Sequence, residues 1–162
     1  MNTVEEKGSL AEAFFMKGFN CSQSVVVAFA QEIGLSEQQA VKMSAGFGAG
    51  FGRMREVCGA FSGIVFVAST LYGNTDPEGK SAFYKEIQDL AKIYREENGG
   101  NSIVCRELLG LKKAEASDGE LSSSWVAEKR SPEYYQKRPC PKLVRLAAEI
   151  MQAYIEKHPV TL

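Results

Sequence analysis

Four cysteines are the residues of this 162-residue chain whose chemistry stands out, and they are widely separated, at Cys21, Cys58, Cys105 and Cys140. No two of them form the C-x-x-C spacing of a thioredoxin-type dithiol or of a zinc ribbon. Any pairing between them must therefore come from the fold. In a reducing compartment, cysteines serve redox chemistry, metal ligation or simple packing. The spacing alone leaves all three interpretations open.

Helix-capping signals predict that the first and third cysteines stand at helix starts. Asn20 and Gln23 have the three-residue spacing of a capping box, so a helix is expected over residues 21–33, with a cysteine at its first position. Ser102 can cap a short helix that contains Cys105. Both cysteines are therefore expected in the first turn of a helix.

The second and fourth cysteines also stand near predicted helix starts. Residues 56–72 are apolar nearly all round, which is typical of a central helix, and Cys58 falls in its first turn. Cys140, between two prolines, stands at the cap of the last helix. Free N–H groups and the positive end of the helix dipole favour a thiolate there. Because Arg53 and Arg55 can add to this effect, Cys58 is the best candidate nucleophile.

The remaining apolar periodicity predicts an all-α fold without a second domain. Further helices, each bounded by a capping residue or a glycine, are expected over residues 10–17, 36–45 and 77–97. Residues 112–138 lack such a pattern and are expected to form a long irregular connection or lid. The predicted structure is a compact single-domain helical bundle, residues 1–162, with about six helices around the central helix near residues 56–72.

A glycine-rich loop, Gly-Phe-Gly-Ala-Gly-Phe-Gly, precedes the Cys58 helix at residues 46–52. No strand is predicted before it and neither G-x-G-x-x-G nor G-K-[ST] is present, so nucleotide binding is not favoured. We expect the loop to pack against the start of the Cys58 helix, where its glycines leave room for a ligand or a partner cysteine. The candidate ligand-binding residues belong to this loop and the adjoining helix start: Gly48, Gly50, Gly52, Arg53, Arg55, Gly59 and Gly63.

The charge balance is close to neutral, with 19 Lys and Arg against 20 Asp and Glu, and neither a basic stripe nor an acidic tail is present. Nucleic acid is therefore not an expected partner. The longest apolar stretch, residues 64–72, is too short to cross a bilayer, so no membrane span is expected. The polar N-terminal residues do not resemble a secretory signal, and we expect a cytoplasmic protein.

Residues 58–63, Cys-Gly-Ala-Phe-Ser-Gly, resemble the C-G-A-x-x-G signature of the redox-active protein family named for the pattern C_GCAxxG_C_C. The order of the other cysteines agrees, since one lies upstream at Cys21 and two follow at Cys105 and Cys140. The resemblance extends over residues 19–141. It implies a small helical protein whose cysteines carry redox activity, and it does not fix the reaction.

The cysteines support three hypotheses. In the first, converging thiols perform thiol–disulfide or electron-transfer chemistry with a small-molecule or protein redox partner, and no cofactor is needed. In the second, a metal ion or an iron–sulfur cluster is the cofactor, with Cys21, Cys58, Cys105 and Cys140 as its ligands. In the third, the chain is a non-catalytic helical module that forms a homodimer, and its cysteines serve only packing.

Within the redox hypothesis, Cys21 and Cys58 are the expected functional pair. Cys21 heads the inward face of its helix, and the glycine loop leads directly into the helix of Cys58. Cys105 and Cys140 are then a second pair, or the remaining ligands if a metal is bound.

Overall fold

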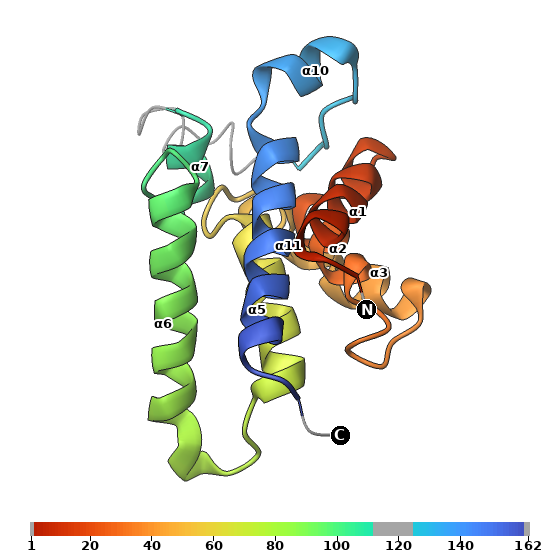
Figure 1. Ribbon diagram of the computed structural model, residues 1–162. Coiled ribbons are helices and arrows are strands. Elements are labelled where there is room, and N and C mark those ends of the chain that lie inside the picture. The colour runs from red at the N-terminus through yellow and green to blue at the C-terminus, as the bar shows by residue number, and fades with distance from the viewer. Residues whose placement is uncertain (1, 112–124, 161–162) are drawn as a thin grey trace.

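The computed structural model describes residues 2–111 and 125–160, and this part of the chain is helical without a β-strand (Figure 1). The helices are α1 (Val4–Met16), α2 (Cys21–Ala28), α3 (Glu37–Ser44), α4 (Gly48–Phe51), α5 (Gly59–Tyr72), α6 (Lys80–Glu97), α7 (Cys105–Leu108), α10 (Pro132–Lys137) and α11 (Cys140–Lys157), with 3-10 turns at Ala45–Phe47 and Pro77–Gly79. Six of the described helices have seven or more residues, which confirms the predicted all-α fold. None of the described helices has the length and apolar character that crossing a membrane requires.

Three long helices stand close together in one half of the molecule. α5 and α11 run in the same direction, and α6 returns beside them in the opposite direction (Figure 1). At the ends of α5 and α11, the Tyr72 hydroxyl donates to the His158 carbonyl at 2.8 Å, and its ring packs edge-on against Tyr154. α5 contacts α2, α6 and α11, so the helix predicted near residues 56–72 is central to the bundle.

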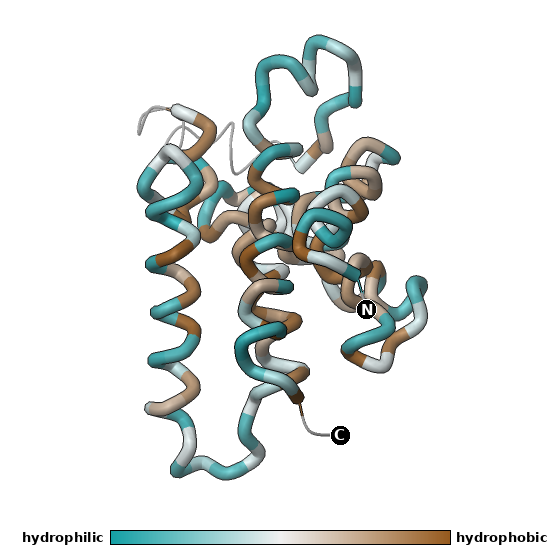
Figure 2. The backbone as a smooth tube through the Cα atoms, in the orientation of Figure 1, coloured by the Kyte–Doolittle hydropathy of each residue, from teal (hydrophilic) through white to brown (hydrophobic). Residues whose placement is uncertain are grey.

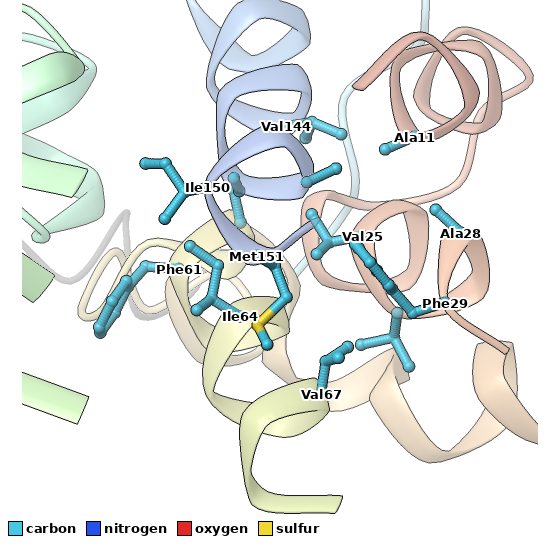
Figure 3. Close-up of a cluster of buried hydrophobic side chains, with 14 of the residues drawn as sticks. Ala11, Val25, Ala28, Phe29, Phe61, Ile64, Val67, Val144, Ile150 and Met151 are labelled. Carbon is cyan, nitrogen blue, oxygen red and sulfur yellow. The ribbon is translucent and has the colours of Figure 1, made fainter. Parts of the chain in front are cut away.

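The buried apolar side chains form one core between α2, α5 and α11. Figure 3 shows Ile64 and Val67 of α5 near Met151 of α11 and Val25 of α2, and all four side chains are fully buried. Burial of each such side chain contributes roughly 1.5–3 kcal/mol. Along α6, hydrophilic and hydrophobic residues alternate (Figure 2), and the buried ones are Leu90, Ala91 and Tyr94.

α2 is shorter than the sequence predicts. It ends at Ala28, and the chain up to residue 34 forms turns instead of continuing the helix. The amides of Phe29 and Ala30 bond three residues back, which tightens the last turn. Three consecutive valines, residues 25–27, precede the last helical residue, and β-branched side chains lower helix propensity because their χ1 angles are restricted.

The connection predicted over residues 112–138 lies partly outside the described residues, which resume at residue 125. Within the described part, Pro132–Lys137 forms α10, so this portion is not irregular as expected. The Ser131 hydroxyl caps the helix by accepting from the Tyr134 amide at 3.1 Å. Pro132 stands at the first helical position, where a backbone N–H would have no hydrogen-bond partner within the helix, so its absence in proline costs nothing.

α2 and α5 approach closely where a glycine replaces a side chain. A Cβ added at Gly63 would lie 2.7 Å from the Cβ of Val25 in α2. Gly63 is a predicted ligand-binding residue, and in the structure its bare face is filled by this helix contact. Gly46 differs, because an added Cβ there has no described atom within 4 Å and its φ is not positive.

The contrast between these glycines gives a stability prediction. Gly63→Ala is expected to destabilise the protein by roughly 1–3 kcal/mol, because the added methyl overpacks the α2–α5 contact. Gly46→Ala is the matched control and is expected to change the free energy of unfolding by less than about 0.5 kcal/mol. Chemical denaturation of both variants measures this. Equal stability of the two variants would contradict the close helix contact.

Candidate functional site

All four cysteines stand at helix starts and meet in one place. Cys21, Cys105 and Cys140 are the first residues of α2, α7 and α11, and Cys58 directly precedes α5. All four are free thiols. Together they line one cavity of about 10 Å³, whose wall includes Gly59. Because such a space is about one water molecule in size, the thiol groups pack closely against one another.

Cys21 and Cys140 form the outer pair of this cluster. Both side chains are partly exposed, and their thiol groups face the same cavity. Interaction between the two thiols raises the pKa of Cys21 and lowers the pKa of Cys140, which is the effect expected when a Cys21 thiol donates to a Cys140 thiolate. Arg138 and the positive end of the 18-residue α11 also favour a negative charge on Cys140. The thiol that affects the pKa of Cys21 most is therefore that of Cys140, and the expected pairing of Cys21 with Cys58 stays a prediction.

Cys58 and Cys105 form the inner pair, with exposed fractions of only 5% and 7%. An isolated antiparallel bridge joins the segments that carry them. In this bridge the Cys58 amide donates to the Ile103 carbonyl at 2.7 Å, and the Cys105 amide donates to the Glu56 carbonyl at 2.6 Å. This register makes the two cysteines diagonal neighbours on one face of the bridge.

The Cys58 thiol faces the Tyr94 hydroxyl at 3.4 Å in the core. Burial raises the pKa of Cys58, the neighbouring Cys21 raises it further, and the hydrogen bond with Tyr94 acts in the opposite direction. Burial therefore acts against the effect of the helix start, and the expectation that Cys58 is the best nucleophile stays a prediction. Tyr94 is a site residue that the sequence analysis misses, although a buried tyrosine hydroxyl needs a partner and so signals a polar contact.

Of the two arginines before Cys58, Arg55 contacts the thiol of Cys105, and their expected effect on Cys58 stays a prediction. Arg55 is only 7% exposed, and its Nη1 lies 3.9 Å from the Sγ of Cys105. Its Nε has no hydrogen-bond partner among the described residues. Arg53 forms an ion pair with Glu128 at 3.4 Å. Burial raises the pKa of Cys105 to about 11, and the charge of Arg55 acts in the opposite direction.

The glycine loop packs against the cysteine cluster, as its place in the chain predicts. A Cβ added at Gly59 would lie 3.0 Å from the Phe47 carbonyl oxygen, 3.1 Å from the Cβ of Cys21 and 3.2 Å from the Cα of Gly48. The backbone amide of Ala49 in this loop lowers the pKa of Cys21. The absence of a side chain at Gly59 thus lets the loop, α2 and α5 meet at one point.

The remaining loop glycines permit a left-handed turn. Residues 49–53 all have positive φ, between 53° and 73°. A Cβ added at Gly50 would lie 2.6 Å from the Glu56 amide, so only glycine lets the chain fold back there. Gly52 has no described atom within 4 Å of an added Cβ, and its φ of 55° accounts for the glycine. These contacts give both glycines a backbone role, and their expected ligand-binding role stays a prediction.

The segment before α11 is held over the cysteine cluster by charged side chains. Glu128 forms ion pairs with Arg53 at 3.4 Å and with Arg138 at 2.5 Å, which links the glycine loop to the start of α11. Arg130 donates to the Phe19 carbonyl at 3.1 Å, next to the start of α2. Figure 1 shows α10 beyond the start of α11, at the same end of the molecule as α7.

The metal hypothesis requires the four sulfurs to form a ligand set. In residues 2–111 and 125–160, no three or more His, Cys, Asp or Glu side chains are arranged to hold a metal ion. The four cysteines belong to these residues and pack around a space about the size of one water molecule. Their arrangement does not fit a preformed zinc or iron–sulfur site, and the metal hypothesis gains no support from it.

A comparison with family models identifies the family. The model described as "Putative redox-active protein (C_GCAxxG_C_C)" matches residues 19–154, which include all four cysteines. The chain belongs to this family. The resemblance seen at residues 58–63 is thereby confirmed. Searches of curated proteins and of solved structures found no match.

The outer pair in this member of the redox-active family yields a reactivity prediction. Cys21→Ala removes the thiol that donates to Cys140, so the pKa of Cys140 is expected to rise, whereas Cys21→Ser retains a donor and is expected to raise it less. A thiolate forms above its pKa, so alkylation of Cys140 should shift to higher pH in the alanine variant. Iodoacetamide labelling across a pH series, followed by peptide mass spectrometry, measures the shift. Identical pH profiles for the wild type and both variants would contradict the hydrogen bond.

Proposed function

We propose that this protein is a thiol-dependent oxidoreductase whose outer pair, Cys21 and Cys140, exchanges electrons with a small-molecule or protein disulfide. The observation that carries the proposal is that two partly exposed thiols line one small cavity, where Cys21 lowers the pKa of Cys140. A partly exposed cysteine with a lowered pKa is a suitable attacking thiolate, and a second thiol within reach can resolve the mixed disulfide. Family membership supports redox activity in general.

The exchange takes place in two steps. The Cys140 thiolate attacks one sulfur of the substrate disulfide, and a mixed disulfide forms as the other sulfur leaves as a thiolate. The Cys21 thiol then loses its proton and attacks the sulfur of Cys140, which releases the second substrate thiolate. The protein gains a Cys21–Cys140 disulfide, the substrate gains two electrons, and a dithiol reductant must later return two electrons to the protein.

Cys21 is suited to the second step because its environment changes during the first. The bond to Cys140 is the largest cause of its raised pKa, and that bond requires a Cys140 thiolate. Once Cys140 is held in the mixed disulfide, this effect disappears. Burial, which raises the pKa of Cys21, remains, as do the Ala49 amide and the charge of Arg130, which lower it. The pKa of Cys21 is therefore expected to fall once Cys140 has reacted, which favours its attack in the second step.

Oxidised glutathione tests the proposal. The reduced wild type is expected to form a Cys21–Cys140 disulfide, detected by blocking free thiols with N-ethylmaleimide and mapping peptides by mass spectrometry. Cys140→Ser is expected to lose the exchange, because it removes the attacking thiolate. Cys21→Ser is expected to accumulate a mixed disulfide of glutathione with Cys140. Four thiols that remain equally free in the wild type before and after oxidation would refute the proposal.

A further inference from the structure

We propose that Cys58 and Cys105 form a second, internal dithiol that reduces the Cys21–Cys140 disulfide from inside the protein, with Cys58 as the connecting sulfur. The protein would then hold four electrons rather than two. This inference rests on the proposed function of the outer pair. It assigns a chemical role to the two buried cysteines, which take no part in the proposed exchange between the outer pair and a substrate disulfide.

Burial prevents the inner pair from reacting directly with a substrate. Cys58 and Cys105 are 5% and 7% exposed, whereas Cys21 and Cys140 are partly exposed. A thiol must approach a disulfide along the line of its sulfur–sulfur bond, so a bulky disulfide reaches only the outer pair. The inner pair nevertheless lines the same cavity of about 10 Å³ as the outer pair, which leaves no room for a partner between them.

The backbone contacts place the four sulfurs in a definite order. Cys140 lines the same small cavity as Cys21, and Cys21 lowers its pKa. The Cβ of Cys21 packs against the bare face of Gly59, the residue that follows Cys58. The antiparallel bridge then holds Cys58 beside Cys105. These contacts give the order Cys140, Cys21, Cys58, Cys105, in which Cys58 is the inner cysteine whose following residue contacts Cys21.

The internal transfer balances without an added reactant. Cys58 loses its proton and attacks the sulfur of Cys21, the Cys21–Cys140 bond breaks, and Cys140 leaves as a thiolate. Cys105 then loses its proton and attacks the sulfur of Cys58, the Cys21–Cys58 bond breaks, and Cys21 leaves. Two electrons move from the inner to the outer pair. The two protons released by Cys58 and Cys105 match those that Cys21 and Cys140 can take up. Cys140 is the better leaving group because a low-pKa thiol leaves faster.

Arg55 is the residue that favours a thiolate at Cys105. A buried guanidinium is costly unless a negative group compensates it, and no carboxylate forms an ion pair with Arg55 among the described residues. Its Nη1 lies 3.9 Å from the Cys105 sulfur, its charge also acts on the carboxylate of Glu128, and its Nε remains without a partner in the described structure. The cation is thus arranged to compensate a negative charge that appears on Cys105 during the transfer. Arg55 acts as a positioning residue, because it takes part in no bond that forms or breaks.

Counting the oxidant consumed separates this inference from the proposed function. Reduced wild-type protein treated anaerobically with excess oxidised glutathione is expected to release four glutathione thiols per chain, in a fast and a slow phase. Mapping is expected to show both Cys21–Cys140 and Cys58–Cys105 disulfides. Release of two thiols, with Cys58 and Cys105 still reduced, would overturn the internal transfer and leave the proposed function standing. Release of none would overturn both.

The Cys21→Ser variant tests the order of the sulfurs. Without Cys21 the inner pair has no route to the surface, so glutathione is expected on Cys140 while Cys58 and Cys105 stay reduced. The inner thiols should resist N-ethylmaleimide in the native variant and react once it is denatured, which shows that the variant is folded. A Cys58–Cys105 disulfide in this variant would overturn the order.

Two Arg55 variants test the role of its charge. Arg55→Gln is expected to slow the second phase relative to the first by roughly tenfold, the loss typical of a hydrogen bond to a charged group. Arg55→Lys is expected to restore most of the rate because it restores the cation. The second-phase rate of the glutamine variant should also rise toward higher pH than that of the wild type. Equal second-phase rates and pH profiles in all three proteins would overturn the role of Arg55.

Discussion

The cysteine cluster depends on one close contact, in which the starts of α2 and α5 meet with no side chain between them. A Cβ added at Gly59 would lie only 3.1 Å from the Cβ of Cys21. One helical turn further along α5, a Cβ added at Gly63 would lie 2.7 Å from the Cβ of Val25. Any larger residue at either glycine would push the helices apart. The distance between the sulfurs is therefore set by helix packing, which protein cores hold rigidly, and not by the flexibility of a loop.

Because the four cysteines pack together, a negative charge on one of them affects the pKa values of the others. Charge on Cys58 or Cys105 raises the pKa of Cys140, and charge on Cys21 raises the pKa of both inner cysteines. Because the site is mostly buried, such repulsion is weakly screened, and a second thiolate is costly while the first is present. The single charge is best placed on Cys140, which is partly exposed and accepts the Cys21 hydrogen bond. We therefore expect that only one of the four sulfurs carries a negative charge at a time.

The sequence predicts the parts of the site that depend on neighbours along the chain. The Asn20–Gln23 capping box places Cys21 at the first position of α2, and the structure contains both of its hydrogen bonds. The C-G-A-x-x-G segment likewise indicates the family, which the match over residues 19–154 confirms. The partner of each thiol could not be predicted, since the bonds of Cys21 to Cys140 and of Cys58 to Tyr94 join residues distant in the chain. Burial, which decides the pKa of Cys58, is likewise a property of the whole fold.

The left-handed turn shows how far the backbone is bent to serve this site. Four residues other than glycine have positive φ within one short segment: Ala49, Phe51, Arg53 and Arg55. Each costs roughly 1–2 kcal/mol, and only a few backbone bonds offset this locally, such as that from the Glu56 amide to the Gly50 carbonyl at 3.1 Å. The turn places the Ala49 amide at the sulfur of Cys21, and Arg55, just beyond it, lies beside Cys105. The same strained segment thus supplies a hydrogen-bond donor to the outer pair and a cation to the inner pair. Backbone strain concentrated at contacts with reactive groups is typical of functional sites, and here it connects the two pairs of thiols through one segment of chain.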